Sequence, residues 1–168
     1  MPTIALQQVS SEFACENAGR TLEKPIALRF IERHLQPDVL RTLQSACPDG
    51  TLYVWGARAE RSHQTVKMLE REAVVFFRRG QTVFKRGVVI ETAYNESLAE
   101  ALWGRETDCQ TWPNVFFFAT IKDINIPASR MNELLGRSPR DNWQGLVVLP
   151  IKDTERVRAF FAKELGAP

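Results

Sequence analysis

The sequence predicts an α+β fold: a small mixed β-barrel of five to six strands with flanking helices. Short apolar segments typical of strands recur along the chain, among them TLYVWG at 51–56 and AVVFF at 73–77. Segments with helical spacing lie between them. The connections at 77–82 and 121–126 are too short for crossover helices, which favours a mixed barrel over a parallel doubly wound sheet.

The N-terminal part gives the weaker signals. Residues 1–20 have little periodicity, so we expect irregular structure or an edge element there. Apolar residues then recur at three- and four-residue spacing from residue 23, which predicts a helix that Pro37 stops. Pro37 can also begin a second helix, which would end before the turn signal CPDG at 47–50.

The remaining elements follow from clearer patterns. Ser62 is a candidate N-cap for a short helix that ends near Glu72. A long strand at 82–92 contains Gly87, which indicates a bulge or a close backbone approach. Asn95 caps a helix that runs to Trp103 and ends at Gly104. The last predicted elements are a strand at 115–121, a helix at 129–135, a strand at 146–149 and a helix at 153–165.

Composition indicates one ordinary globular domain. The chain has 168 residues, of which 44% are hydrophobic and 25% are charged. No segment approaches the roughly 18 apolar residues that would span a bilayer, and no signal peptide is readable, so we expect a cytoplasmic protein without a membrane partner. The three scattered cysteines form neither a zinc pattern nor a disulfide framework.

No motif for catalysis, cofactor binding or metal binding is present. The chain lacks a Gly-rich phosphate loop and a G-x-S-x-G nucleophile elbow. Its two histidines, His34 and His63, do not have the spacing of a zinc site. Cys109 has no histidine close to it in sequence, which makes it a poor nucleophile candidate. We therefore expect no catalytic residue, no metal and no cofactor.

Positive charge is concentrated in one segment. Residues 58–86 hold eight Lys or Arg against three acids, a net charge of +5, while the rest of the chain is −3. Such a segment is often only a solvated face. If its side chains gather on one side of the domain, it indicates a site for a polyanion.

The order of several short segments from 52 to 150 resembles the PUA-like superfamily, specifically its YTH/EVE branch. The resemblance is closer to the N-terminal recognition domains of McrB-type modification-dependent restriction enzymes. It is carried by LYVWG at 52–56, AVVFF at 73–77, NESLAEALWG at 95–104, TW at 111–112 with VFFF at 115–118, IPASRMNELLG at 126–136 and QGL at 144–146. The resemblance implies a barrel that holds one extruded or modified base in an aromatic cage. The strand before the pocket often ends in Lys-Ser in that branch and ends in Trp55-Gly56-Ala57 here, so the family's polar base contacts do not carry over.

Tryptophans are the candidate walls of such a pocket, because stacking on aromatic rings stabilises an extruded base. Trp55 fits a pocket wall and a core packing residue equally well. Trp103 lies off the centre of its helix's apolar stripe, and Trp112 opens a strand, so each is a wall or a packing residue. Asn95 can equally be only a helix cap. The candidate pocket residues are Trp55, Ser62, His63, Asn95, Trp103 and Trp112.

We therefore expect residues 1–50 to form a helical extension packed on a base-recognition domain at 51–168. The predicted function is non-catalytic recognition of DNA with a modified (methylated) base, which is flipped into the pocket, as the specificity module of a restriction system. A motor or nuclease domain would act with it, in cis or in trans. The alternatives are an RNA reader of the same fold and a protein-interaction domain with an inert pocket. The candidate phosphate contacts are Arg58, Arg61, Arg78, Arg79, Lys85 and Arg86.

Overall fold

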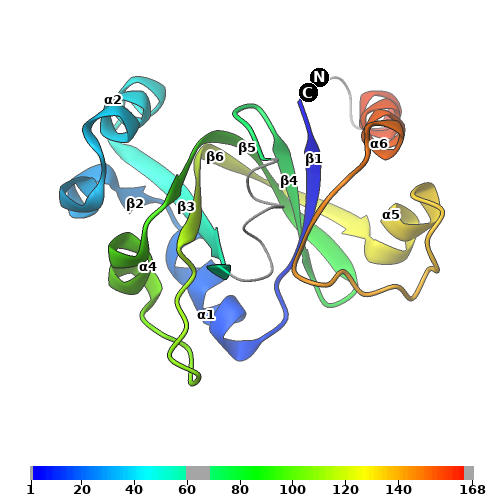
Figure 1. The fold of residues 1–168 in the computed structure, drawn as a ribbon. Helices are drawn as coiled ribbons and strands as arrows, with labels where there is room; N and C mark the ends of the chain where they lie inside the picture. Colours follow the sequence, from blue (N-terminus) through cyan, green and yellow to red (C-terminus); the bar gives the residue numbers. More distant parts are fainter. Residues whose placement is uncertain (1, 60–68, 165–168) are drawn as a thin grey trace.

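A curved seven-stranded sheet organises the part of the chain that the computed structural model describes, residues 2–59 and 69–164 (Figure 1). The strand order is β2-β3-β6-β5-β4-β1-β7. Only β1 and β4 are parallel neighbours in it, and the other adjacent pairs are antiparallel. The strands are β1 (Ile4–Gln8), β2 (Ile26–Ala27), β3 (Thr51–Ala57), β4 (Val74–Arg79), β5 (Thr82–Tyr94), β6 (Asn114–Pro127) and β7 (Leu146–Val148). The α+β class is confirmed, with seven strands where five to six were predicted.

Five α-helices and two short 3-10 helices surround the sheet in the described residues. The α-helices are α1 (Glu12–Thr21), α2 (Pro37–Ala46), α4 (Glu96–Trp103), α5 (Ala128–Leu134) and α6 (Ile151–Glu164); the 3-10 helices are η1 (Leu28–Phe30) and η2 (Glu32–His34). None of these helices is long and apolar enough to cross a membrane. Cys15, Cys47 and Cys109 are all free thiols.

The prediction for residues 1–20 was wrong. β1 is an interior strand between β4 and β7, and the side chain of Ser11 caps α1 by accepting a hydrogen bond from the amide of Ala14. β1 was missed because only five residues form it and its buried positions point to both faces of the sheet. The sheet thus takes strands from both sides of residue 50.

The helix predicted from residue 23 is also absent. Ile26 pairs with Leu52 in the sheet, and the two 3-10 helices η1 and η2 follow. The apolar spacing was real, but strand pairing and the preceding Pro25 favour an extended start of this segment. Pro37 does begin α2, as predicted.

The predictions for β3, β4, β5 and α4 are confirmed within a few residues. The side chain of Asn95 caps α4, and Gly104 ends it at a φ of 74°. Gly87 is a point of close approach, because an added Cβ would lie 2.5 Å from Cδ1 of Ile121. The helix predicted from Ser62 lies largely outside the described residues.

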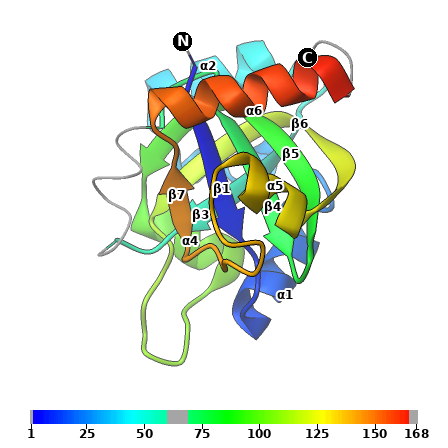
Figure 2. The ribbon, with the colours of Figure 1, turned by 90° about the vertical axis from the view of Figure 1, so that its right-hand side faces the viewer.

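The two faces of the sheet bury separate hydrophobic clusters. Alternate residues of β1 point to opposite faces: Ile4 and Leu6 pack beneath α5 and α6, whereas Ala5 belongs to the cluster that includes α1, α2 and α4. Figure 2 shows α5 and α6 together on the side that carries β1. The sequence-predicted tryptophans all lie in the cluster with α1.

Candidate functional site

The three predicted tryptophans come together as one packed cluster. Trp55 lies in β3, Trp103 is the last residue of α4, and Trp112 lies two residues before β6. The ring centroids of Trp55 and Trp112 are 5.1 Å apart, and those of Trp103 and Trp112 are 5.8 Å apart. We call Trp55, Trp103 and Trp112 the tryptophan cluster. Its members are 1%, 3% and 8% exposed, so the rings cover one another in this structure.

Two phenylalanines extend the tryptophan cluster. Phe13 of α1 meets Trp112 edge to face at 5.1 Å, and Phe77 of β4 meets Trp55 in the same way at 5.8 Å. The cluster therefore joins the ends of β3 and β4 to α1. These contacts bring together segments that lie up to about 100 residues apart in the sequence.

Trp103 has the contacts of a core residue. Its indole N–H donates to Oγ1 of Thr21 at 3.0 Å, and that hydroxyl in turn donates to the carbonyl oxygen of Val54 at 2.7 Å. Its ring lies so close to Gly56 that a Cβ there would be 2.5 Å from Cζ3 of Trp103. These contacts favour packing over an open pocket wall for Trp103.

Trp112 connects the tryptophan cluster to charged groups at the surface. Its indole N–H donates to Oε2 of Glu106 at 3.2 Å, and Nε of Arg58 donates to the same oxygen at 2.6 Å. Arg58 also donates to Oδ2 of Asp108 at 3.1 Å. The hydrogen bond with Glu106 is the main cause that raises the pKa of Arg58. A cation is thus held next to the most exposed of the three tryptophans.

Glu106 and Asp108 belong to a loop at 104–111 that projects beyond the sheet between α4 and β6 (Figure 1). The amide of Glu106 donates to the carbonyl oxygen of Gln110 at 2.9 Å, and the guanidinium of Arg105 donates to the carbonyl oxygen of Cys109. Cys109 has a φ of 62°, which non-glycine residues seldom adopt. These hydrogen bonds connect the two sides of the loop.

Helix α1 presents one face to the tryptophan cluster. Phe13, Asn17 and Thr21 are spaced four residues apart and share that face. Asn17 is 0% exposed, and no hydrogen-bond partner for either side-chain amide atom occurs among the described residues. The indole N–H of Trp55 is likewise buried and unpaired there. Asn17 was not predicted as a site residue, because the sequence pattern indicated no helix at 12–21.

Arg78 is buried and does not contact the solvent, which corrects its assignment as a phosphate contact. It is 1% exposed and lies over the ring of Trp143. Its guanidinium donates to the carbonyl oxygens of Gly80 and Asp141 and to Oδ1 of Asn142. Burial lowers the pKa of Arg78, and the nearby charge of Asp141 opposes this effect.

Two of the other predicted phosphate contacts, Arg79 and Lys85, lie over the same ring of Phe84, and each is ion-paired. Arg79 forms an ion pair with Glu23, and Lys85 forms one with Asp123. The guanidinium of Arg86 lies 5.7 Å from the ring centre of Phe161 in α6, near the other hydrophobic cluster. Among the described residues, cations of the +5 segment therefore lie near both hydrophobic clusters, on the two faces of the sheet. Arg61, together with the pocket candidates Ser62 and His63, lies outside the described residues.

Asn95 lies at the start of α4, and its backbone amide donates to the carbonyl oxygen of Pro113, the residue after Trp112, at 2.7 Å. Its Oδ1 accepts from the amide of Leu98, and its Nδ2 donates to the carbonyl oxygen of His34 at 2.6 Å. It also lines a cavity of about 410 Å³ between η2 and α4. With both amide groups engaged, Asn95 acts as a helix cap.

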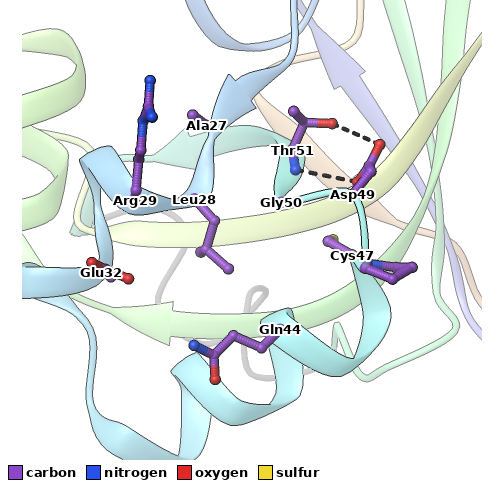
Figure 3. Close-up of a pocket in the computed structure, with 10 residues that line it drawn as sticks. Ala27, Leu28, Arg29, Glu32, Gln44, Cys47, Asp49, Gly50 and Thr51 are labelled. Atoms are coloured by element: carbon purple, nitrogen blue, oxygen red, sulfur yellow. Dashed lines mark hydrogen bonds between the residues drawn. The ribbon is translucent and has the colours of Figure 1, made fainter.

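A second cavity, of about 620 Å³, lies between η1, the end of α2 and the turn that precedes β3 (Figure 3). Leu28, Gln44 and Cys47 line it, and its Asp49 carboxylate accepts hydrogen bonds from the amide and hydroxyl of Thr51. None of the predicted site residues lines this cavity. Within the described residues, no three His, Cys, Asp or Glu side chains gather closely enough to hold a metal ion.

Comparison with known proteins identifies the fold. No protein family model matches the chain, and no curated protein matches it in sequence. Among solved structures, the chain is similar to the N-terminal domain of Thermococcus gammatolerans McrB bound to m5C DNA. The TM-score is 0.74 at 17% sequence identity, and the match covers 97% of this chain and 99% of the other. The fold expected from the sequence resemblance is confirmed.

Proposed function

We propose that this chain is a non-catalytic recognition domain that binds DNA carrying a modified base. The observation that carries the proposal is the contact between the tryptophan cluster and Arg58 through Glu106. Flat aromatic rings beside a surface cation suit a nucleotide, because the rings can stack on the base while the cation attracts the phosphate. The shared fold supports the proposal, since the similar McrB domain is bound to m5C DNA.

In this proposal the base leaves the duplex and enters between α1 and the tryptophan cluster. Extruding a base costs a few kcal/mol, and stacking on an aromatic ring returns about 1–3 kcal/mol per base. Trp112 and Trp55 are the proposed stacking partners, because Trp103 is fixed by Thr21 and Gly56. Entry requires the edge-to-face contact of Phe13 with Trp112 to open.

The proposed role in the cell is that of a specificity module for a modification-dependent restriction system. The described residues contain no metal-binding group, and the proposed site includes no nucleophile beside a base. Cleavage would then be supplied by a motor or nuclease domain, either on the same chain or on a partner.

The test is a binding titration with the 168-residue chain and labelled oligonucleotides. Each oligonucleotide carries cytosine or 5-methylcytosine at one position and is prepared as single strand and duplex, in DNA and RNA. We expect tighter binding to methylated DNA than to its unmodified form. Equal affinity for all of them would contradict the proposal, and a preference for the RNA forms would make the domain an RNA reader.

A variant separates the phosphate contact from the reading of the base. Arg58→Met should weaken binding to methylated and unmodified DNA by the same factor, since a phosphate contact carries no base information. Arg71→Met is the matched control, because Arg71 is also exposed and ion-paired but pairs with Glu91 of β5 and contacts Thr42 of α2. It should leave both affinities unchanged. Loss of discrimination in Arg58→Met would instead place Arg58 in the reading of the base.

A further inference from the structure

The buried amide of Asn17 has unused hydrogen-bonding capacity. Its side chain is fully buried, and neither Nδ2 nor Oδ1 has a partner in the described part of the chain. A carboxamide carries two N–H donors and one oxygen acceptor. Burying such a group without partners destabilises the folded state, so native proteins seldom retain one without another reason.

The side-chain amide of Asn17 lies on the face of α1 that contacts the tryptophan cluster. One turn before it, Phe13 touches Trp112, and one turn after it, Thr21 bonds to Trp103 and to β3. Asn17 lies between these two contacts on the same face of α1. Trp55 belongs to the same cluster, and its buried indole N–H is also unpaired in the described residues.

A second asparagine shows how this fold treats a structural amide. Asn132 of α5 is also 0% exposed. Its Nδ2 donates to the carbonyl oxygens of Pro139 and Asp141, and its Oδ1 accepts from the indole N–H of Trp143 at 2.8 Å. Within the described residues, the side-chain amide of Asn132 therefore has hydrogen-bond partners for both of its polar atoms, whereas that of Asn17 has none.

We propose that Asn17 and the indole N–H of Trp55 hydrogen-bond the polar edge of the bound base and determine specificity at this site. This inference rests on the proposed function. A nucleobase edge carries an N–H donor beside a ring-nitrogen or carbonyl acceptor, and a carboxamide complements that pair with one acceptor and one donor. Base binding satisfies groups that the free domain leaves unpaired. A ring of the same shape without polar groups leaves them unpaired, and a site of this kind rejects it.

The first test compares stability in matched variants. Asn17→Leu and Asn17→Ala remove the unsatisfied amide, whereas Asn132→Leu and Asn132→Ala remove a satisfied one. We expect the Asn17 variants to melt at or above the temperature of the unaltered chain and the Asn132 variants to melt below it. Using two replacements separates the loss of the amide from a misfit of one side chain. Equal destabilisation at both positions would make Asn17 a structural residue and overturn the inference.

The second test measures reading of the base in the full chain. The probes are an oligonucleotide with one 5-methylcytosine and the same strand with difluorotoluene, a ring of similar shape without strong hydrogen-bonding groups, at that position. The unaltered chain should bind the 5-methylcytosine strand about tenfold more tightly. The Asn17 variants should bind the two strands about equally. Trp55→Phe, which keeps a ring and removes the N–H, should reduce the preference in part.

The outcomes distinguish this inference from the proposed function. If the unaltered chain binds neither probe, the proposed function fails and the inference fails with it. If the unaltered chain prefers the 5-methylcytosine strand and the Asn17 variants retain that preference, the function stands and Asn17 does not read the base.

Discussion

At the scale of single residues, Trp103 and Gly56 form one packing unit. The indole of Trp103 is anchored by Thr21 at one end, and its ring lies against the backbone of Gly56. Because any side chain at Gly56 would enter the space of that ring, the smallest residue is required near the end of β3. The sequence could not decide this role, since a tryptophan at the end of an amphipathic helix fits a pocket wall as well as a core.

Trp103→Ala should lower the free energy of unfolding by about 3–5 kcal/mol, because it removes a large buried ring and leaves Thr21 without its donor. Chemical denaturation of the variant measures this loss. Discrimination between methylated and unmodified DNA should persist in the fraction that stays folded. Retained stability with lost discrimination would make Trp103 a wall of the base pocket.

Gly56→Ala should cost about 1–3 kcal/mol of stability, because the new methyl group forces Trp103 or the carbonyl of Trp112 to move. Gly19→Ala is the matched control: Gly19 lies in α1, and nothing is within 4 Å of its added Cβ. The control should gain about 0.5–1 kcal/mol from helix propensity. Thermal melting of the two single variants should show shifts of opposite sign.

At the scale of elements, a buried arginine fixes the connection between α5 and β7. Arg78 at the end of β4 bonds to the carbonyl oxygen of Asp141 and to the side chain of Asn142. Asn132 of α5 binds the same connection through Pro139 and Asp141. An arginine beside a predicted turn reads as a surface residue in sequence, and its burial depends on a segment sixty residues further along the chain.

Arg78→Met should destabilise the domain by about 2–4 kcal/mol, because it leaves buried acceptors unpaired that now bond to a charged donor. Backbone amides of residues 137–145 should exchange with deuterium faster than in the unaltered chain. Arg79→Met, the control at the next position, removes a partly exposed ion pair with Glu23 and should change stability by about 1 kcal/mol or less. Equal losses of stability at Arg78 and Arg79 would contradict a specific role of Arg78 in holding the connection between α5 and β7.

At the scale of the whole molecule, folding pairs much of the positive charge in the described part of residues 58–86 with acidic residues. Arg58, Arg71, Arg79 and Lys85 all pair with carboxylates from outside that segment. Linear charge density therefore overestimates the positive field of the folded domain. Only the three-dimensional structure shows which acidic residues come to lie beside these cations.

The salt dependence of DNA binding should accordingly be shallow. We expect the logarithm of the affinity to fall by about one to three units per tenfold rise in salt, because a paired cation must break a protein contact before it meets a phosphate. Removing two pairing carboxylates, in Glu23→Gln with Asp123→Asn, should steepen that slope by about one to two units. If the logarithm of the affinity of the unaltered chain falls by more than about six units per tenfold rise in salt, this prediction is wrong and the cations act as one basic surface.

The elements from β3 onward were predictable because each has a strong local signal. The apolar run in β4 and the Asn95 and Gly104 boundaries of α4 are examples. β1 and α1 were not predictable, since their apolar patterns are short and the residues they pack against lie far along the chain. The tryptophans were visible as candidates. The role of Asn17 was not, because a missing hydrogen bond is a property of the folded structure alone.

The interior place of β1 also bears on the order in which the protein folds. Within this domain, β1 is synthesised before both of its partners: it pairs with β4, some seventy residues later, and with β7, which ends at Val148. The carbonyl oxygen of Pro2 also accepts a hydrogen bond from Arg158 of α6, which adds one more distant contact next to β1. Contacts of such long sequence separation slow folding, because chain entropy is lost before they form. We therefore expect the sheet to be completed only after β7 has been synthesised.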